Sequence, residues 1–82
     1  MFYKKEVIIK KDLKARAAAQ VVEKVKNLEC SLHLQKNSRK ANLKSLIGVL
    51  SLDLKYDDKI TIISDIDNIN IIISILKEEG II

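Results

Sequence analysis

The most informative part of this 82-residue chain is one segment, Asn42-Leu43-Lys44-Ser45-Leu46-Ile47-Gly48-Val49-Leu50-Ser51-Leu52. It predicts a short helix, because Ser45 is a residue type that favours the N-cap position and apolar residues follow it. As an N-cap, the Ser45 hydroxyl accepts from a backbone N–H group one turn on. A phosphate there would face unpaired N–H donors and the positive end of the helix dipole. The segment therefore has two interpretations: an ordinary N-cap with a buried helix behind it, or a phosphorylation switch.

Two more helices are predicted, one on each side of this segment. Apolar residues recur at three- and four-residue spacing over residues 15–27. The residues of this helix that recur at that spacing are Ala15, Ala18, Ala19, Val22 and Val25. The last helix is expected to start near Asp67 or Asn68 and to end before Gly80. Its expected buried residues are Ile69, Ile72, Ile73 and Leu76.

Strands are predicted where apolar residues alternate with others. One face of an opening strand carries Tyr3, Lys5, Val7 and Ile9, and a second, half-buried strand is indicated by Cys30, Leu32 and Leu34. The polar run over residues 36–40 predicts a turn, so residues 41–43 should return as a hairpin partner. Residues 60–64 are predicted to form the fourth strand. The order βαββαβα predicts an α+β fold with helices on one face of an antiparallel sheet.

A second segment carries a recognisable pattern, Asp12-Leu13-Lys14-Ala15-Arg16-Ala17-Ala18. Together with residues 42–52, it resembles HPr, the small phosphocarrier of the bacterial phosphotransferase system, over essentially the whole chain. The family signature is Gly-Leu-His-Ala-Arg-Pro-Ala, and its histidine carries the phosphoryl group. Here Asp12 replaces the glycine, Ala17 the proline and Lys14 the histidine. The resemblance implies one HPr-like domain over residues 1–82, an open-faced β-sandwich with a four-stranded antiparallel sheet and three helices.

Lys14 is unsuited to phosphoryl transfer. A relay nucleophile must be partly unprotonated near neutral pH, which suits imidazole, with an ordinary pKa of about 6.5, and not lysine, at about 10.4. Lys14 lies in a polar stretch that gives no sign of burial. We therefore interpret Lys14 as a degenerate phosphocarrier position. The rest of the pattern resembles the histidine-lacking group called catabolite-repression HPr, which keeps the regulatory serine that corresponds to Ser45.

The resemblance implies a regulatory protein. The single cysteine and the lack of a recognised secretory signal favour the cytoplasm, and the lack of a catalytic set such as Ser–His–acid disfavours an enzyme. HPr kinase/phosphorylase would phosphorylate Ser45, and the phosphoprotein would act as corepressor for the catabolite control protein, a LacI-type transcription regulator, in carbon catabolite repression. The partner-binding residues would be Arg16, Leu46, Ile47 and Leu50. Arg16 has a second interpretation, an exposed arginine without energetic consequence. Because strand-exchanged dimers occur among histidine-lacking relatives, a homodimer is kept as an alternative to a monomer.

Two other functions stay open. A divergent scaffold related to the phosphotransferase system would bind an enzyme or transporter domain without being phosphorylated. A residual phosphocarrier that uses another residue ranks last.

Composition and charge disfavour several other classes of protein. The net charge of +4 and the pI near 9.3 suit nucleic-acid binding, but the three aromatic residues are not interleaved with the basic ones, so direct binding of nucleic acid is not expected. The longest apolar run, Ile71-Ile72-Ile73, is too short for a membrane span. One cysteine precludes an internal disulfide, and no secretory signal is recognised at the start. Cys30 and His33 supply too few ligands for a metal site, and no cofactor is expected.

Overall fold

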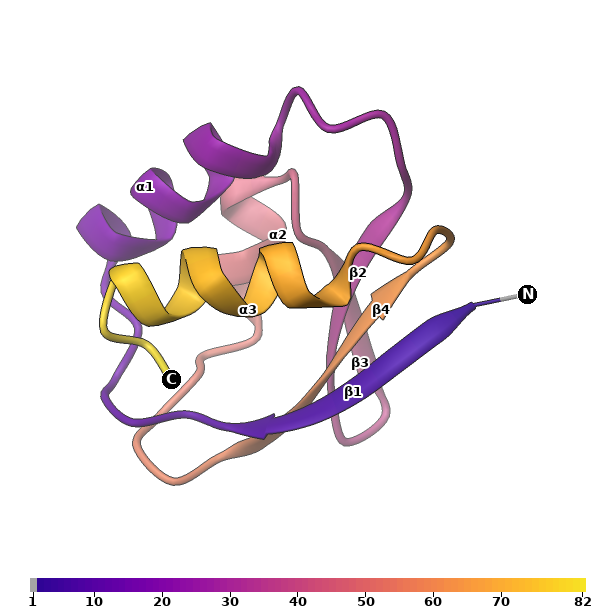
Figure 1. The fold of residues 1–82 in the computed structure, drawn as a ribbon. Helices are drawn as coiled ribbons and strands as arrows, with labels where there is room; N and C mark the ends of the chain where they lie inside the picture. Colours follow the sequence, from indigo (N-terminus) through magenta and orange to yellow (C-terminus); the bar gives the residue numbers. More distant parts are fainter. Residues whose placement is uncertain (1) are drawn as a thin grey trace.

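The computed structural model describes residues 2–82, in which the elements follow the predicted order βαββαβα. Their bounds are β1 Tyr3–Ile8, α1 Ala15–Val25, β2 Leu32–Lys36, β3 Arg39–Asn42, α2 Leu46–Ser51, β4 Lys59–Ser64 and α3 Ile69–Glu78. The four strands form one antiparallel sheet in the order β1-β4-β2-β3, and the helices lie together on one of its faces (Figure 1). The α+β fold class is confirmed.

Strand β4 occupies an interior position although it comes late in the chain. It pairs with β1 through Val7 opposite Ile60, and with β2 through Leu34 opposite Ile62. Ile60 and Ile62 are buried, whereas Thr61 between them is only partly covered. Strands β1 and β3 are therefore the two edges of the sheet.

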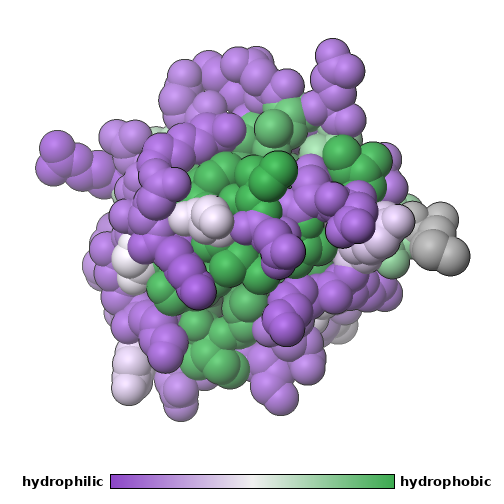
Figure 2. Space-filling model, viewed as in Figure 1, coloured by the Kyte–Doolittle hydropathy of each residue, from purple (hydrophilic) through white to green (hydrophobic). Residues whose placement is uncertain are grey.

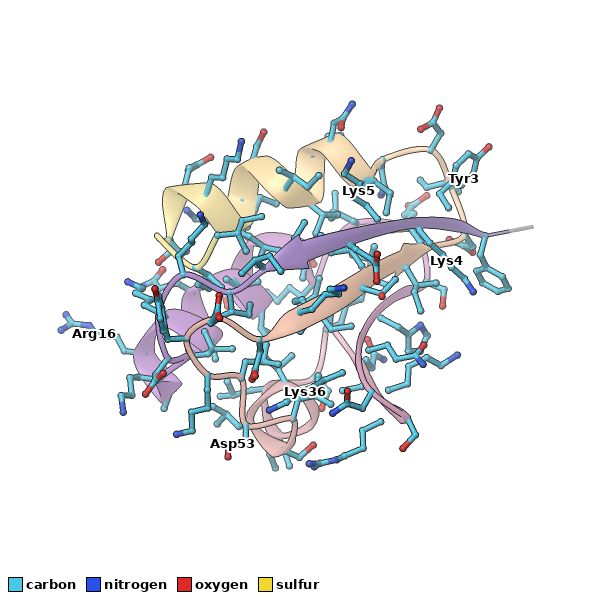
Figure 3. All side chains as sticks on the ribbon, turned by 90° about the horizontal axis from the view of Figure 1, so that it is seen from below. Tyr3, Lys4, Lys5, Arg16, Lys36 and Asp53 are labelled. Carbon is cyan, nitrogen blue, oxygen red and sulfur yellow. The ribbon has the colours of Figure 1, made fainter. Side chains whose placement is uncertain are left out.

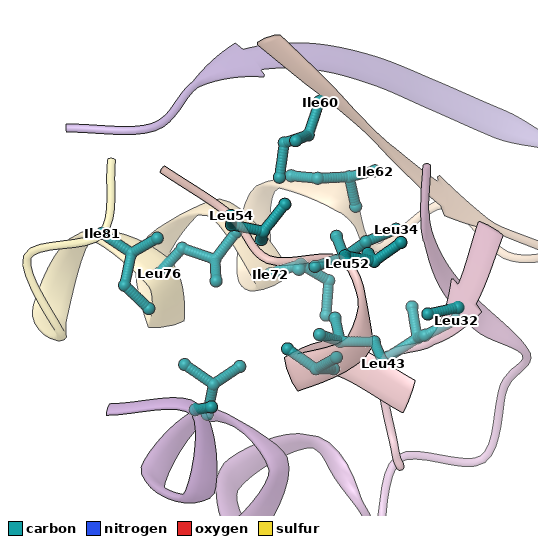
Figure 4. Packing of buried hydrophobic residues seen from close by; sticks show 14 of the residues in the cluster. Leu32, Leu34, Leu43, Leu52, Leu54, Ile60, Ile62, Ile72, Leu76 and Ile81 are labelled. Atoms are coloured by element: carbon teal, nitrogen blue, oxygen red, sulfur yellow. The ribbon is translucent and has the colours of Figure 1, made fainter. Parts of the chain in front are cut away.

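The core between sheet and helices is aliphatic, as a chain with only three aromatic residues requires. Figure 4 shows its centre, where side chains from β2, β4, α3 and the segments around α2 meet. The fully buried members include Leu34, Leu43, Leu52, Ile60, Ile62, Ile72 and Leu76. This shared core holds α2 against the sheet, because Val49 of that helix and Leu52 just after it are both buried.

Helix α1 departs from prediction in its end and in its buried face. It ends at Val25, and its buried residues are Ala18, Val21 and Val25 rather than the expected set. Val22 is partly buried, and Ala15 and Ala19 are exposed. Alanine fits either face of a helix at little cost, so an alanine-rich pattern does not define the buried stripe.

Strand β1 is more exposed than its alternating pattern predicted. Tyr3 and Lys5 are exposed and Val7 is partly buried, while Ile9, just past the strand end, is completely buried. Strand β1 is an edge strand with a neighbouring strand on one side only, and it is less covered than the interior strand β4.

The second strand starts later than predicted. Cys30 lies in the connection before β2 and is partly buried. There the Ser31 N–H donates to the Asp65 carboxylate at 2.8 Å, which ties this connection to the loop after β4. The hairpin partner, β3, begins at Arg39 rather than at residue 41.

Helix α3 follows the prediction closely. Asn68 occupies its N-cap position, and Ile72 and Leu76 are buried, whereas Ile69 and Ile73, which were also predicted to be buried, are only partly buried. The helix ends at Glu78, and Gly80 adopts a positive φ of 72°. The Gly80 N–H donates to the Lys77 carbonyl and the Ile81 N–H to the Leu76 carbonyl, a Schellman ending that glycine permits without strain.

Candidate functional site

Ser45 occupies the N-cap position of α2, as the sequence predicted. Its backbone is extended, with φ −111° and ψ 115°, and its Oγ accepts a hydrogen bond from the Gly48 N–H at 3.1 Å. The turn before it is fixed by the Asn42 side chain, which accepts from the Lys44 N–H at 2.8 Å. Ser45 is only partly buried. Its hydroxyl is thus held in one orientation at the surface of the helix start.

Gly48 faces this hydroxyl across the first turn of α2. A methyl group at position 48 would lie 3.2 Å from Ser45 Oγ and 3.6 Å from the Ala41 side chain. The first of these distances is tighter than ordinary van der Waals contact. The absence of a side chain at position 48 therefore leaves the Ser45 hydroxyl its space. The sequence reasoning missed this role, and its only signal was a glycine inside a helical pattern.

The apolar side chains of α2 divide into an exposed and a buried set. Ile47 is 82% exposed and Leu50 is 36% exposed, whereas Val49 is buried. Leu46 is partly buried and packs against the core, so it differs from the two exposed residues. The exposed apolar patch on α2 therefore consists of Ile47 and Leu50, with Leu46 at its buried margin.

Lys14 lies at the N-cap position of α1. Its backbone is extended, with φ −93° and ψ 163°, and its side chain makes no capping hydrogen bond. Lys14 is exposed, in agreement with the expectation of an unburied lysine. Just before it, the Asp12 carboxylate accepts from the Tyr56 N–H at 2.8 Å, so this side chain fixes the turn that precedes α1.

Arg16 is exposed in the first turn of α1, and Figure 3 shows it projecting away from the rest of the chain. Helices α1 and α2 pack against each other. No hydrogen bond or ion pair within residues 2–82 joins Lys14 or Arg16 to Ser45. The structure thus places these residues on neighbouring helices without direct polar contact.

Basic side chains from the β2–β3 hairpin hold the end of α2. The Arg39 guanidinium donates to the Ser51 carbonyl. Lys36 Nζ donates to the Asp53 carbonyl at 2.8 Å, and both residues are labelled in Figure 3. Lys36 also forms an ion pair with Asp58 at 2.8 Å. That contact, together with the Lys55 N–H, lowers the pKa of the Asp58 carboxyl below its ordinary value. These contacts, which the sequence did not reveal, fasten α2 to the sheet.

The remaining chemically active side chains do not gather into a site. Within residues 2–82 there is no group of three or more His, Cys, Asp or Glu residues that could hold a metal ion. His33 lies on the outer face of the sheet, whereas Cys30 Sγ accepts from the Asn68 amide at 3.2 Å. In the same part of the chain, no helix combines the length and the apolar character needed to cross a membrane.

The sequence matches the family model described as the PTS HPr component phosphorylation site, over residues 4–76. The chain belongs to the HPr family. The HPr-like protein Crh of Bacillus subtilis (strain 168) is 34% identical over 61 residues, which make up 74% of this chain and 72% of that relative. The chain that presents Ser45 at the start of α2 is thus similar in sequence to Crh.

Solved HPr-family structures have the same fold. A phosphocarrier protein HPr from Bacillus anthracis superimposes with a TM-score of 0.80 at 24% identity, over 95% of each chain. The structure of B. subtilis Crh, described as a swapped dimer, superimposes with a TM-score of 0.71 at 27% identity, over 89% of this chain and 88% of that one. These similarities confirm the four-stranded sheet with three helices as an HPr fold.

Proposed function

We propose that this protein is a regulatory HPr-like domain, spanning residues 1–82, that is phosphorylated on Ser45 and then acts as a corepressor in carbon catabolite repression. The observation that carries the proposal is the position of Ser45 in a member of the HPr family. Its partly exposed hydroxyl starts α2 two residues before Ile47, which is 82% exposed. A modifiable group and an apolar contact residue are thus presented on one short helix.

Phosphorylation would change this surface strongly. A phosphoserine carries about −1.5 to −2 charges at neutral pH and three acceptor oxygens. The first turn of α2 contains no acidic residue that would repel it, and the Gly48 N–H already faces the Ser45 oxygen at 3.1 Å. A partner would then recognise the phosphate together with Ile47 and Leu50. Arg16 on the neighbouring helix would add a cationic contact.

Lys14 supports a regulatory rather than a phosphocarrier role. Lys14 is exposed and stands where the family has its phosphocarrier histidine, and a lysine amine is a poor relay group compared with an imidazole. The proposed partners are HPr kinase/phosphorylase and the LacI-type catabolite control protein, in the cytoplasm. No catalytic activity, cofactor, metal or direct contact with nucleic acid or membrane is part of the proposal.

Two measurements test the proposal in sequence. The purified chain is incubated with HPr kinase/phosphorylase and ATP, and intact-mass spectrometry should show one added phosphoryl group that is absent from Ser45→Ala. Phosphorylated and unphosphorylated chains are then titrated with the catabolite control protein, and only the phosphorylated one should bind tightly. A wild-type chain that stays unlabelled while an active HPr control is labelled would refute the proposal.

A scaffold that is never phosphorylated is the second candidate. It is favoured by one observation, that the Ile47–Leu50 patch is exposed without any phosphate while the Ser45 hydroxyl serves as a helix cap. Equal binding of the two forms to one partner would support the scaffold. Self-association, suggested by the swapped Crh dimer, is checked by sedimentation of the same samples.

A further inference from the structure

A groove of about 400 Å³ runs between strand β1 and helix α3, on a different part of the molecule from Ser45. Its apolar lining comes from both elements and the C-terminal segment, namely Val7, Ile8, Ile73 and Ile82. Ile8 is 38% exposed, and the other three are partly buried. Figure 2 shows apolar atoms gathered over this side of the molecule with hydrophilic residues around them.

One wall of the groove is the free edge of the sheet. Strand β1 pairs with β4 alone. Beyond the strand, the Ile9 N–H donates to the Asp58 carbonyl and the Ile9 carbonyl accepts from the Asp57 N–H, so the polar backbone groups of Ile9 point inward. Along an antiparallel strand, the N–H and C=O groups of successive residues point alternately toward and away from the neighbouring strand. The N–H and C=O groups of Ile8 and Glu6 therefore point away from β4, toward the free edge. The groove thus presents backbone donors and acceptors beside its apolar floor.

The charge of the groove is mainly positive. Its rim carries Lys5, Lys10 and Lys77 against one carboxylate, Glu6. All three lysines are exposed, and none forms an ion pair within residues 2–82. Figure 3 shows Lys5 projecting from β1 toward α3. A ligand that brought carboxylates to this groove would find uncompensated ammonium groups.

We propose that this groove binds an extended, acidic and apolar peptide segment of a partner protein, which adds to β1 as a fifth strand. Main-chain hydrogen bonds to the outward groups of Glu6 and Ile8 would align the segment. Apolar side chains on one face would rest on Ile73 and Ile82. Carboxylates in the segment would pair with the groove lysines.

A second copy of this chain fits the edge poorly. Two β1 strands placed side by side would bring together Lys4 and Lys5 from both copies, with Lys10 and Lys77 of each close by, against one Glu6 per chain. Lysines on edge strands oppose self-pairing in this way, yet they attract a strand of opposite charge.

The test uses the unphosphorylated full chain, so it does not depend on Ser45. The probe is the octapeptide Glu-Thr-Ile-Thr-Ile-Thr-Glu-Thr, with fluorescein on its N-terminus and an amidated C-terminus, so that its glutamates and isoleucines share the strand face that turns toward α3. Fluorescence anisotropy should show saturable binding, and amide resonances of β1 and the C-terminal half of α3 should shift. A peptide with lysine in place of glutamate should not bind. An octapeptide N-methylated on alternate residues, on the edge that faces β1, should also fail to bind.

Two matched variants separate the groove from general charge attraction. The triple change Lys5→Gln, Lys10→Gln and Lys77→Gln should weaken probe binding about tenfold, because three exposed ion pairs are lost. The control change Lys26→Gln, Lys40→Gln and Lys55→Gln removes the same charge from exposed lysines outside the groove and away from β1 and α3, and it should leave binding nearly unchanged. Both variants should melt close to the wild-type temperature.

Several results would overturn the proposal. These are equal weakening in the two triple variants, undiminished binding of the N-methylated peptide, or resonance shifts confined to α2 or to the outer face of the sheet. Absence of binding at millimolar probe, or a β1-mediated dimer that excludes the probe, would do the same.

Discussion

Gly48 lies directly against the Ser45 side chain in the first turn of α2. The Gly48 N–H donates to the Ser45 oxygen at 3.1 Å, and a Cβ atom at position 48 would approach that oxygen to 3.2 Å. The same glycine also receives a bond at its carbonyl from the Ser51 hydroxyl at 2.6 Å. Gly48 therefore forms hydrogen bonds with both serines of the segment, through its N–H group to Ser45 and through its carbonyl to Ser51.

Gly48→Ala should slow the phosphorylation of Ser45. The added methyl group crowds the hydroxyl that a kinase must reach, while alanine itself favours the helix by about 1 kcal/mol over glycine. We expect a chain that melts near the wild-type temperature but acquires phosphate more slowly in a timed kinase assay. Labelling at the wild-type rate would show that the space beside Ser45 is not needed.

Ser45→Ala should abolish labelling and cost about 0.5–2 kcal/mol of stability, the usual loss for an N-cap. Ser51→Ala is the matched control, because it removes a hydroxyl from the other end of the same helix. Urea unfolding measures the stability change, and intact mass measures the labelling. If the Ser45→Ala chain still acquired phosphate on another serine, Ser45 would not be the phosphorylation site.

Ile47→Ala should hardly change the melting temperature, since the side chain is 82% exposed. It should weaken binding of the phosphorylated chain to the catabolite control protein by about 1 kcal/mol or more, which marks an important interface position. The contrasting variant is Leu52→Ala, which empties a buried position and should cost about 2–5 kcal/mol of stability. A large stability loss at Ile47 with unchanged binding would exclude it from the interface.

Lys14 should not receive phosphate from phosphoenolpyruvate through enzyme I. Lys14→His restores an imidazole, yet we expect at best weak carrier activity. The preceding turn is fixed by the contact between Asp12 and the Tyr56 N–H, and Ala17 follows where the family has proline. The measurement is acid-labile phosphate on the chain, with a histidine-containing HPr as positive control. Acid-labile phosphate on the wild-type chain that disappears in Lys14→Ala would contradict this prediction.

The contact between Lys36 and Asp58 predicts an acid-side loss of stability. It lowers the pKa of Asp58 in the folded state, so its stabilising effect is complete above the unfolded pKa of about 4 and is lost as the pH falls through the folded value. Asp58→Asn should therefore destabilise the chain at neutral pH, and the difference in melting temperature should shrink below about pH 4.

Asp57→Asn is the control for this measurement. Asp57 is exposed with a positive φ of 73°, a conformation that asparagine adopts readily. A melting difference between Asp58→Asn and wild type that does not vary with pH would refute the electrostatic account.

Local signals predicted α2 and its cap well, because Ser45 and the apolar residues after it act within one turn. The same local reasoning failed where contacts with residues distant in sequence determine which side chains are buried. Alanines left the buried face of α1 undefined, so Val21 was missed. The edge position of β1, which exposes Tyr3, depends on β4 rather than on its own alternation. Gly48 and the contacts of Lys36 became meaningful only once the folded chain brought their partners close.

The interior position of β4 also governs how this chain can fold during synthesis. Strand β1 pairs only with residues 59–64, so the first strand made must wait for almost three quarters of the chain before it finds its neighbour. Until then only the β2–β3 hairpin can form in the sheet. Closing so long a loop is entropically costly and slows folding. A nascent chain halted before β4 would expose apolar surface to chaperones and proteases, and release of residues 59–82 would complete the sheet in one cooperative step.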